Sequence, residues 1–203
     1  MSARVALPRR LAARLASASS PRRFFFNLPG LGAGAGNDAT QRLTASRVLP
    51  YAPEPLYELI ADVDSYHRFV PYCSRSRVTQ WSDPDPATGR RWPTLADLHV
   101  GWGGFAEAFT SRLRCVPGIS VEAVSGDDLA PASAVFKTLV TRWSVQPVST
   151  HPAPSTEVHL TITYQFANPI YAAVSATVSD KVAGLMIEAF EKQAEERLGP
   201  GPK

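Results

Sequence analysis

The sequence is poor in the features that mark secreted and membrane-spanning proteins. Only two of its 203 residues are cysteines, Cys73 and Cys115, and they form no CxxC pair. This scarcity argues against a disulfide framework and favours a reducing compartment or one in which the redox state has no effect. No stretch of the chain approaches eighteen consecutive apolar residues, so the sequence predicts no helix that spans a bilayer.

Motifs for catalysis and metal binding are also missing. The four histidines form no HxxxH or HExxH pair, and no GxSxG motif marks a serine nucleophile. Cys73 follows His67 by six residues, but a pair so close across a proline turn has no third group to orient it. A small buried residue is the favoured interpretation of Cys73. The sequence therefore predicts no catalytic residue, no metal and no cofactor.

Acidic residues are absent from the first 37 residues, which contain six arginines. Three leucines, Leu7, Leu11 and Leu15, recur there at four-residue spacing, and serine is frequent. This composition is typical of a mitochondrial transit peptide, and a disordered basic tail that binds anionic surfaces is the alternative. The rest of the chain contains the other 15 of the 21 Lys and Arg residues and all 18 acidic residues, so its net charge is −3. Such a charge gives no indication of nucleic-acid binding.

The middle of the chain shows the period-two alternation of β-strands. The predicted strands, separated by turn signals rich in Pro, Gly and Asp, are 43–51, 73–82, 92–101, 104–116, 118–125, 133–146 and 155–167. Two small helices fit between the first two strands, one starting at Pro53 and one from Asp64 to Phe69. Because the later gaps are short, consecutive strands are expected to pair as an antiparallel meander.

The end of the chain predicts one long helix. Asn168 and Pro169 suit its first positions, and Gly199 suits its stop. The helix would be about 30 residues long, or about 45 Å. Its apolar stripe, at steps of three and four, consists of Val174, Val178, Val182, Leu185, Met186, Ala189 and Phe190.

Together these elements predict an α+β fold in which the long helix covers the apolar face of an open antiparallel sheet. If the sheet curls, one helix cannot fill its concave face, and the remaining volume becomes a pocket for a hydrophobic ligand. A core filled by large side chains is the alternative. Glu107 shares the alternation of Phe105 and Phe109, so it is a candidate pocket carboxyl with a pKa raised by desolvation. An edge position, a bulge that reverses the alternation, or an ion pair with Arg112 or Arg114, is the alternative for Glu107.

One segment of the sequence resembles a known protein family. Residues 47–73, RVLPYAPEPLYELIADVDSYHRFVPYC, resemble the coenzyme Q-binding proteins of the START-like, polyketide-cyclase-related superfamily, and Phe69–Cys73 is the most specific part. The match continues at Phe109–Arg112, Leu139–Trp143 and Val182–Phe190, and it covers about 42–198. Tyr72 is a departure, because tryptophan is common there in the family.

The resemblance implies a helix-grip fold, a hydrophobic tunnel under the terminal helix and binding of ubiquinone or a related polyisoprenoid lipid. It implies a lipid chaperone, not an enzyme, that supports respiration and coenzyme Q biosynthesis. The expected location is the matrix side of the mitochondrial inner membrane, in peripheral contact with that membrane and with coenzyme Q biosynthetic or respiratory complexes. A polyketide cyclase or aromatase-like enzyme, or a ribosome-interacting module of the same fold, is the alternative.

The chain then divides into a transit peptide and linker at 1–37, a START-like lipid-binding domain at 38–199 and a tail at 200–203. Trp102, in the glycine-rich segment Gly101–Gly104, is a candidate for insertion into the membrane interface; packing on the sheet is the alternative. The residues expected to contact the ligand are Phe69, Val70, Pro71, Tyr72, Trp102, Phe105, Phe109, Leu139, Trp143, Ile162, Tyr164, Val178, Val182, Leu185 and Met186.

Overall fold

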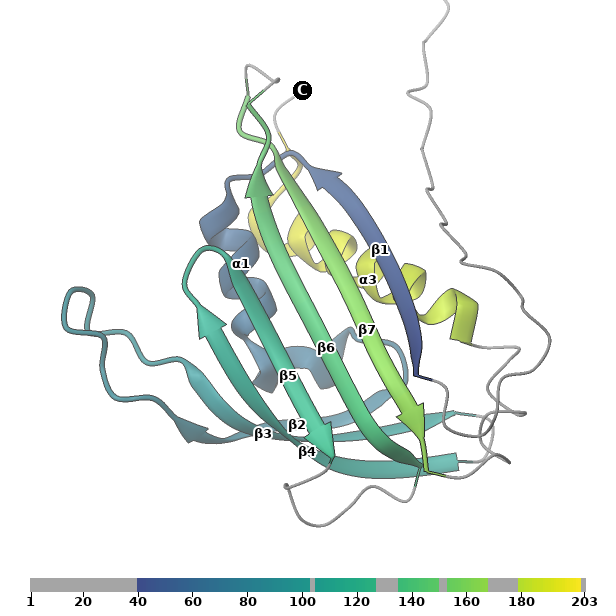
Figure 1. Ribbon diagram of the computed structural model, residues 1–203. Helices are drawn as coiled ribbons and strands as arrows, with labels where there is room; N and C mark the ends of the chain where they lie inside the picture. The colour runs from purple at the N-terminus through teal and green to yellow at the C-terminus, as the bar shows by residue number, and fades with distance from the viewer. Residues whose placement is uncertain (1–39, 103–104, 127–134, 150–152, 168–178, 202–203) are drawn as a thin grey trace, which may run out of the picture.

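The computed structural model describes residues 40–102, 105–126, 135–149, 153–167 and 179–201, which form a curved sheet with helices on one side (Figure 1). The expected transit peptide, and the expected helix start at Asn168, lie outside the described residues. The strands are β1 (Gln41–Leu49), β2 (Cys73–Trp81), β3 (Pro93–Trp102), β4 (Phe105–Val116), β5 (Ser120–Gly126), β6 (Phe136–Pro147) and β7 (Thr156–Phe166).

The sheet is an open antiparallel meander whose last strand pairs with the first strand of the chain. Among the described residues it has the order β1-β7-β6-β5-β4-β3-β2, and every neighbouring pair is antiparallel. Strands β2 to β6 each pair with the next strand along the chain, as short gaps predict, whereas β1 crosses to the far edge and pairs with β7. The register of β2 on β3 shifts between Cys73 and Arg75 and again after Val78. Such irregularities increase the local twist of a sheet, and β2 to β4 run across the lower end of the remaining strands (Figure 1).

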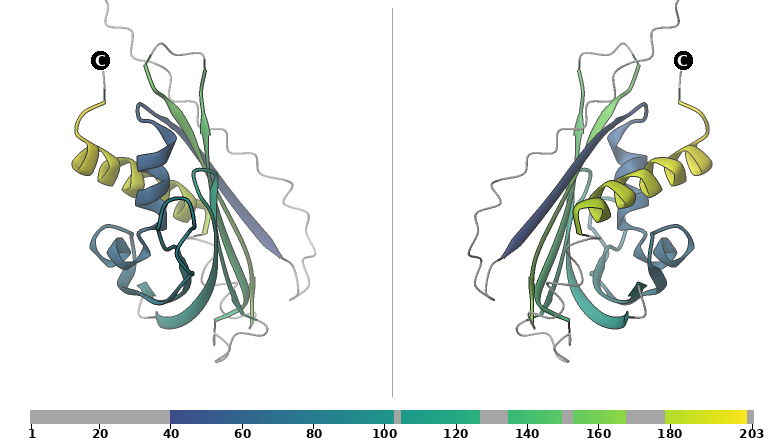
Figure 2. Two further views of the ribbon diagram at one scale, coloured as in Figure 1. Left: turned by 90° about the vertical axis from the view of Figure 1, so that its left-hand side faces the viewer. Right: turned by 90° about the vertical axis from the view of Figure 1, so that its right-hand side faces the viewer.

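In the part of the chain that the structure describes, three helices lie at expected positions: α1 (Pro53–Ala61), the 3-10 helix η1 (Val63–Arg68) and α3 (Ser179–Leu198). Proline at the start of α1 supplies a fixed φ where no backbone donor is needed. The backbone N–H of Val78 donates to the Asp64 carboxylate at 2.6 Å, which ties η1 to β2. Figure 2 shows that these helices lie on the same side of the sheet, so the concave face is the covered face.

Helix α3 is packed against the rest of the protein along most of its described length. It buries Ala183, Ile187, Phe190 and Ala194, which recur at steps of three and four. At its end, the Arg197 guanidinium lies 2.8 Å from the Asp62 carboxylate, and the Tyr51 hydroxyl donates to the carbonyl of Gly199 at 2.8 Å. Gly199 has φ +81 and ends the helix as predicted. These contacts fix where α3 crosses the concave face.

Candidate functional site: an apolar cavity under α3

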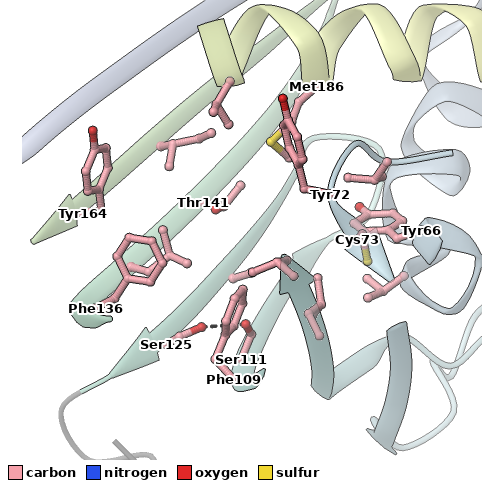
Figure 3. A pocket seen from close by; sticks show the side chains of 18 of the residues that line it. Tyr66, Tyr72, Cys73, Phe109, Ser111, Ser125, Phe136, Thr141, Tyr164 and Met186 are labelled. Carbon is pink, nitrogen blue, oxygen red and sulfur yellow. Dashed lines mark hydrogen bonds between the residues drawn. The ribbon is translucent and has the colours of Figure 1, made fainter. Parts of the chain in front are cut away.

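A cavity of about 220 Å³ lies between the concave face of the sheet, the turn after η1 and helix α3 (Figure 3). Its lining comes from every strand except the body of β2, from η1 and from one turn of α3. An apolar cavity of about 150 Å³ is enough to stay dry and bind a benzene-sized molecule. The predicted pocket is therefore present, and it is large enough for an aromatic ring.

The distribution of large and small side chains explains why the cavity stays open. Phe190 of α3 packs on Trp143 with ring centroids 4.4 Å apart and on Phe69 at 4.9 Å, so aromatic rings fill the space under the C-terminal half of the helix. Where β4 and β5 face the cavity, the side chains include the small residues Ser111 and Ala123. Small residues leave the volume beneath the N-terminal part of the described helix unfilled.

Most of the predicted ligand-contacting residues are at the cavity wall. They come from the turn after η1, from β4, β6 and β7, and from α3: Val70, Pro71, Tyr72, Phe109, Leu139, Trp143, Ile162, Tyr164, Val182 and Met186. The structure brings these residues together because the period-two alternation of each strand directs one side chain in two to the concave face. Val178 and the side chains of Trp102 and Phe105 lie outside the described part of the structure.

Phe69 and Leu185 are not placed at the cavity wall. The ring of Phe69 packs edge-to-face on Tyr66 and Phe190 instead, within the aromatic cluster. Leu185 is 37% exposed. The buried face of the helix is rotated relative to the predicted apolar stripe. Val182 and Met186 lie at the edge of this buried face, where it borders the cavity. At 100° per residue, Leu185 falls beyond that edge, toward solvent.

Glu107 lies on β4 directly opposite Val100, on the face predicted from its alternation. It is half-buried, and the described lining of the cavity does not include it. Arg112, in the opposite alternation, is exposed.

Sequence reasoning missed the polar side chains of the wall. Ser111, Ser125 and Thr141 line the cavity, and the Ser111 and Ser125 hydroxyl oxygens lie 2.7 Å apart. Ser111 follows Phe109 by two residues, so the alternation that selected Phe109 also selects Ser111. The signal was present but was passed over because serine is more often exposed than buried.

Several other polar side chains at or near the wall are hydrogen-bonded within the protein. The Tyr66 hydroxyl donates to the carbonyl of Ile60, and burial raises the pKa of Tyr66 well above its usual range. Burial also raises the pKa of the Cys73 thiol, which donates to the carbonyl of Arg75 at 3.4 Å. His67 Nδ1 contacts the Asp64 carbonyl oxygen at 2.8 Å and the Ser76 hydroxyl at 3.2 Å. Cys73 is thus a neutral buried thiol, and His67 is engaged elsewhere.

Within the described residues, no cluster of three or more His, Cys, Asp or Glu side chains could hold a metal ion. The helices of this part of the chain include none that is long and apolar enough to cross a membrane.

Comparison with known families agrees with this geometry. The family described as polyketide cyclase / dehydrase and lipid transport matches residues 49–191, which include nearly all of the described elements. The chain belongs to this family. Solved structures of a START superfamily protein from Mycobacterium smegmatis and of an aromatase/cyclase superpose on this chain with TM-scores of 0.62 and 0.63, so the predicted helix-grip α+β fold is confirmed.

Two curated relatives carry different names. The mitochondrial coenzyme Q-binding protein coq10 of Schizosaccharomyces pombe is 39% identical over 152 residues, which are 74% of this chain and 84% of that protein. The ribosome association toxin RatA of Pseudomonas aeruginosa is 27% identical over 154 residues, or 76% of this chain and 95% of that protein. The first relative confirms the resemblance to coenzyme Q-binding proteins.

Among solved structures, the Zhui aromatase/cyclase of a Streptomyces species superposes with a TM-score of 0.63 at 14% identity. The superposition covers 79% of this chain and 96% of that protein. At this identity the similarity shows a shared fold only.

Proposed function

We propose that this protein binds a polyprenyl benzoquinone of the coenzyme Q type in the cavity under α3 and acts as a lipid chaperone without chemical turnover. One observation carries the proposal: a chain 39% identical to a coenzyme Q-binding protein encloses an apolar cavity at the position where the resemblance implies a tunnel. The ligand contacts proposed are those of the predicted residues that line this cavity.

The energetics suit such a ligand. Burying hydrocarbon yields about 0.8 kcal/mol per CH₂. The ring and a few isoprene units can supply roughly 8 kcal/mol after the costs of binding, which corresponds to micromolar affinity. The described lining includes no carboxylate, imidazole or amine, which are the groups that most often transfer protons in enzymes. This composition favours a carrier over a cyclase-like enzyme.

The ligand tail is expected to enter beside Tyr72. This residue lines the cavity and yet is 44% exposed, so the cavity reaches the surface there. Its backbone has φ +64, which is uncommon for a residue other than glycine. The Gly101 N–H donates to the Tyr72 carbonyl at 2.9 Å and holds the turn against β3. Strained backbone of this kind is concentrated at binding sites.

We infer a mitochondrial location, peripheral to the inner membrane on its matrix side, where quinone is exchanged with biosynthetic or respiratory complexes. The Arg-rich segment at 1–37 and the relative named mitochondrial support this location. The exposed aromatic residue at the cavity edge supports contact with a lipid surface, because aromatic residues with a polar tip favour the membrane interface.

Membrane contact predicts a result for vesicle flotation. Tyr72→Asn keeps a residue that tolerates positive φ and removes the aromatic ring, so a clearly smaller fraction of the protein should float with phosphatidylcholine–cardiolipin vesicles. Trp81→Ala is the control, since Trp81 is 48% exposed at the opposite end of β2 and should not change flotation. If Tyr72→Asn floats to the same extent as the unmodified protein, the surface around Tyr72 does not contact the membrane.

The function itself is tested by solvent extraction of the purified protein followed by mass spectrometry. The expected result is a benzoquinone with a polyprenyl tail, absent from an unrelated protein purified in parallel. Because one relative is named for ribosome association, binding to ribosomes is the second candidate function. An extract without quinone, together with co-sedimentation with ribosomes, would overturn the quinone proposal in favour of that candidate.

A further inference from the structure

A pair of serine hydroxyls lies on the wall of the apolar cavity. Ser111 of β4 and Ser125 of β5 are 2% and 4% exposed, and both line the cavity. Their hydroxyl oxygens are 2.7 Å apart, a good hydrogen-bond distance. Figure 3 shows the pair joined by this bond, next to Phe109 and across the cavity from α3.

The pair has one donor more than it uses. A serine hydroxyl carries one O–H and two lone pairs. The mutual bond consumes one O–H, and either oxygen can be the donor, so one O–H is always left over. The described residues offer neither hydroxyl a second partner. Buried donors in proteins are nearly always bonded, to protein, to water or to ligand.

The side chains next to the pair leave its spare O–H available to a ligand. Along β4 the neighbours on the cavity face are Phe109 and Leu113, and the residue opposite Ser125 on β6 is Leu139. These side chains have no acceptor. A ligand group that enters the cavity with a carbonyl oxygen would meet the free O–H of the pair in a largely apolar environment, where a hydrogen bond is stronger than in water.

We propose that the Ser111–Ser125 pair is the site that recognises the polar ring of the ligand. In this proposal, which rests on the proposed function, the pair donates one hydrogen bond to a ring carbonyl of the quinone. The ring then lies against Phe109, and the tail extends toward Val182, Met186 and the exposed edge at Tyr72.

The same pair can hold both redox forms of the ring. A quinone carbonyl accepts the spare O–H of the pair. A hydroquinone O–H instead donates to a serine lone pair, and the two serines remain bonded to each other because their mutual bond has no fixed direction. The pair therefore selects a ring that bears oxygen without discriminating between its oxidised and reduced states.

The test uses the double variant Ser111→Ala/Ser125→Ala. Replacing both partners of a buried hydrogen bond by apolar groups of similar shape is nearly neutral for folding, so the melting temperature should stay close to that of the unmodified protein. Two probes are compared: a benzoquinone with a ten-carbon alkyl tail, and a benzene ring with the same tail. We expect the double variant to bind the quinone probe about tenfold more weakly, in line with the loss of about one hydrogen bond, and to bind the alkylbenzene within about twofold of the unmodified protein.

The matched control is Ser120→Ala. Ser120 is also a buried serine of β5, but it is not among the described lining residues, and its removal should leave both affinities unchanged. Infrared spectroscopy of the bound quinone supplies a direct readout: the carbonyl stretching band should lie at lower wavenumber in the unmodified protein than in the double variant. A structural effect of the serines would not move this band.

The outcomes separate this proposal from the proposed function. Unchanged quinone affinity and an unshifted carbonyl band in the double variant would show that the pair holds water only, although quinone still binds. Equal losses for the two probes would show damage to the cavity and would also overturn the proposal. Failure of the unmodified protein to bind the quinone probe would instead refute the proposed function.

Discussion

The substitution Leu139→Lys is expected to abolish binding of the quinone. Leu139 lies on β6 between Ser125 and Tyr164 on the neighbouring strands, and it lines the cavity. A lysine ammonium there would lie against the ring or tail of the ligand, and the described lining has no acid to pair with it. Moving a charge into apolar surroundings costs several kcal/mol, so quinone affinity should fall by a factor of about 100 or more.

The measurement is the quinone content of the purified variant by extraction and mass spectrometry, with circular dichroism as the check on folding. Val124→Lys is the control: Val124 is 37% exposed on β5, outside the described cavity wall, and the variant should keep its quinone. A folded Leu139→Lys protein with a full quinone load would place the ligand elsewhere.

A matched pair on α3 tests the same cavity from the opposite side. Val182 lines the cavity, whereas Leu185, one turn further along, is exposed. Val182→Asp should therefore lose quinone as Leu139→Lys does, and Leu185→Asp should retain it. Loss of quinone in both variants would contradict the observed rotation of the helix.

Phe190→Ala is expected to have the largest effect on stability. Phe190 is 2% exposed, and its ring contacts Trp143, Phe69 and Tyr66 at centroid distances of 4.4, 4.9 and 5.3 Å. Truncating it leaves a void between α3 and the sheet that these rings cannot close. Phe→Ala substitutions in cores cost about 3–5 kcal/mol of unfolding free energy, and we expect a value in this range.

Urea unfolding at equilibrium measures this loss. Lys192→Ala is the control on the same helix, because the Lys192 side chain is 78% exposed and its removal should change the unfolding free energy by no more than about 0.5 kcal/mol. A loss below about 1 kcal/mol for Phe190→Ala would mean that the aromatic cluster does not anchor α3.

The strands and their cavity faces were largely predictable from the sequence. On β7, Ile162 and Tyr164 reach the wall because a strand directs every second side chain to the same face. This rule is local, so it needs no knowledge of neighbouring strands. The pairing of β1 with β7 was different. Nothing in their sequences marks them as partners, and the pairing depends on the whole meander being in place.

The rotation of α3 shows where the pattern was ambiguous. Leu185 and Met186 are as apolar as Ile187 and Phe190, so several neighbouring rotations of the helix give an apolar stripe. Packing against β1 and the Trp143 ring selects the observed rotation, since it buries Ile187 and Phe190 and leaves Leu185 at the surface.

The amino-acid sequence by itself determined the strands, the helices and the apolar character of the face they share, because these follow from side-chain periodicity along short stretches of chain. Only the tertiary structure decided that a cavity remains and that Ser111 and Ser125 meet on its wall. Both outcomes depend on how the sheet curves and on which residues of neighbouring strands are paired, and these are properties of distant segments brought together.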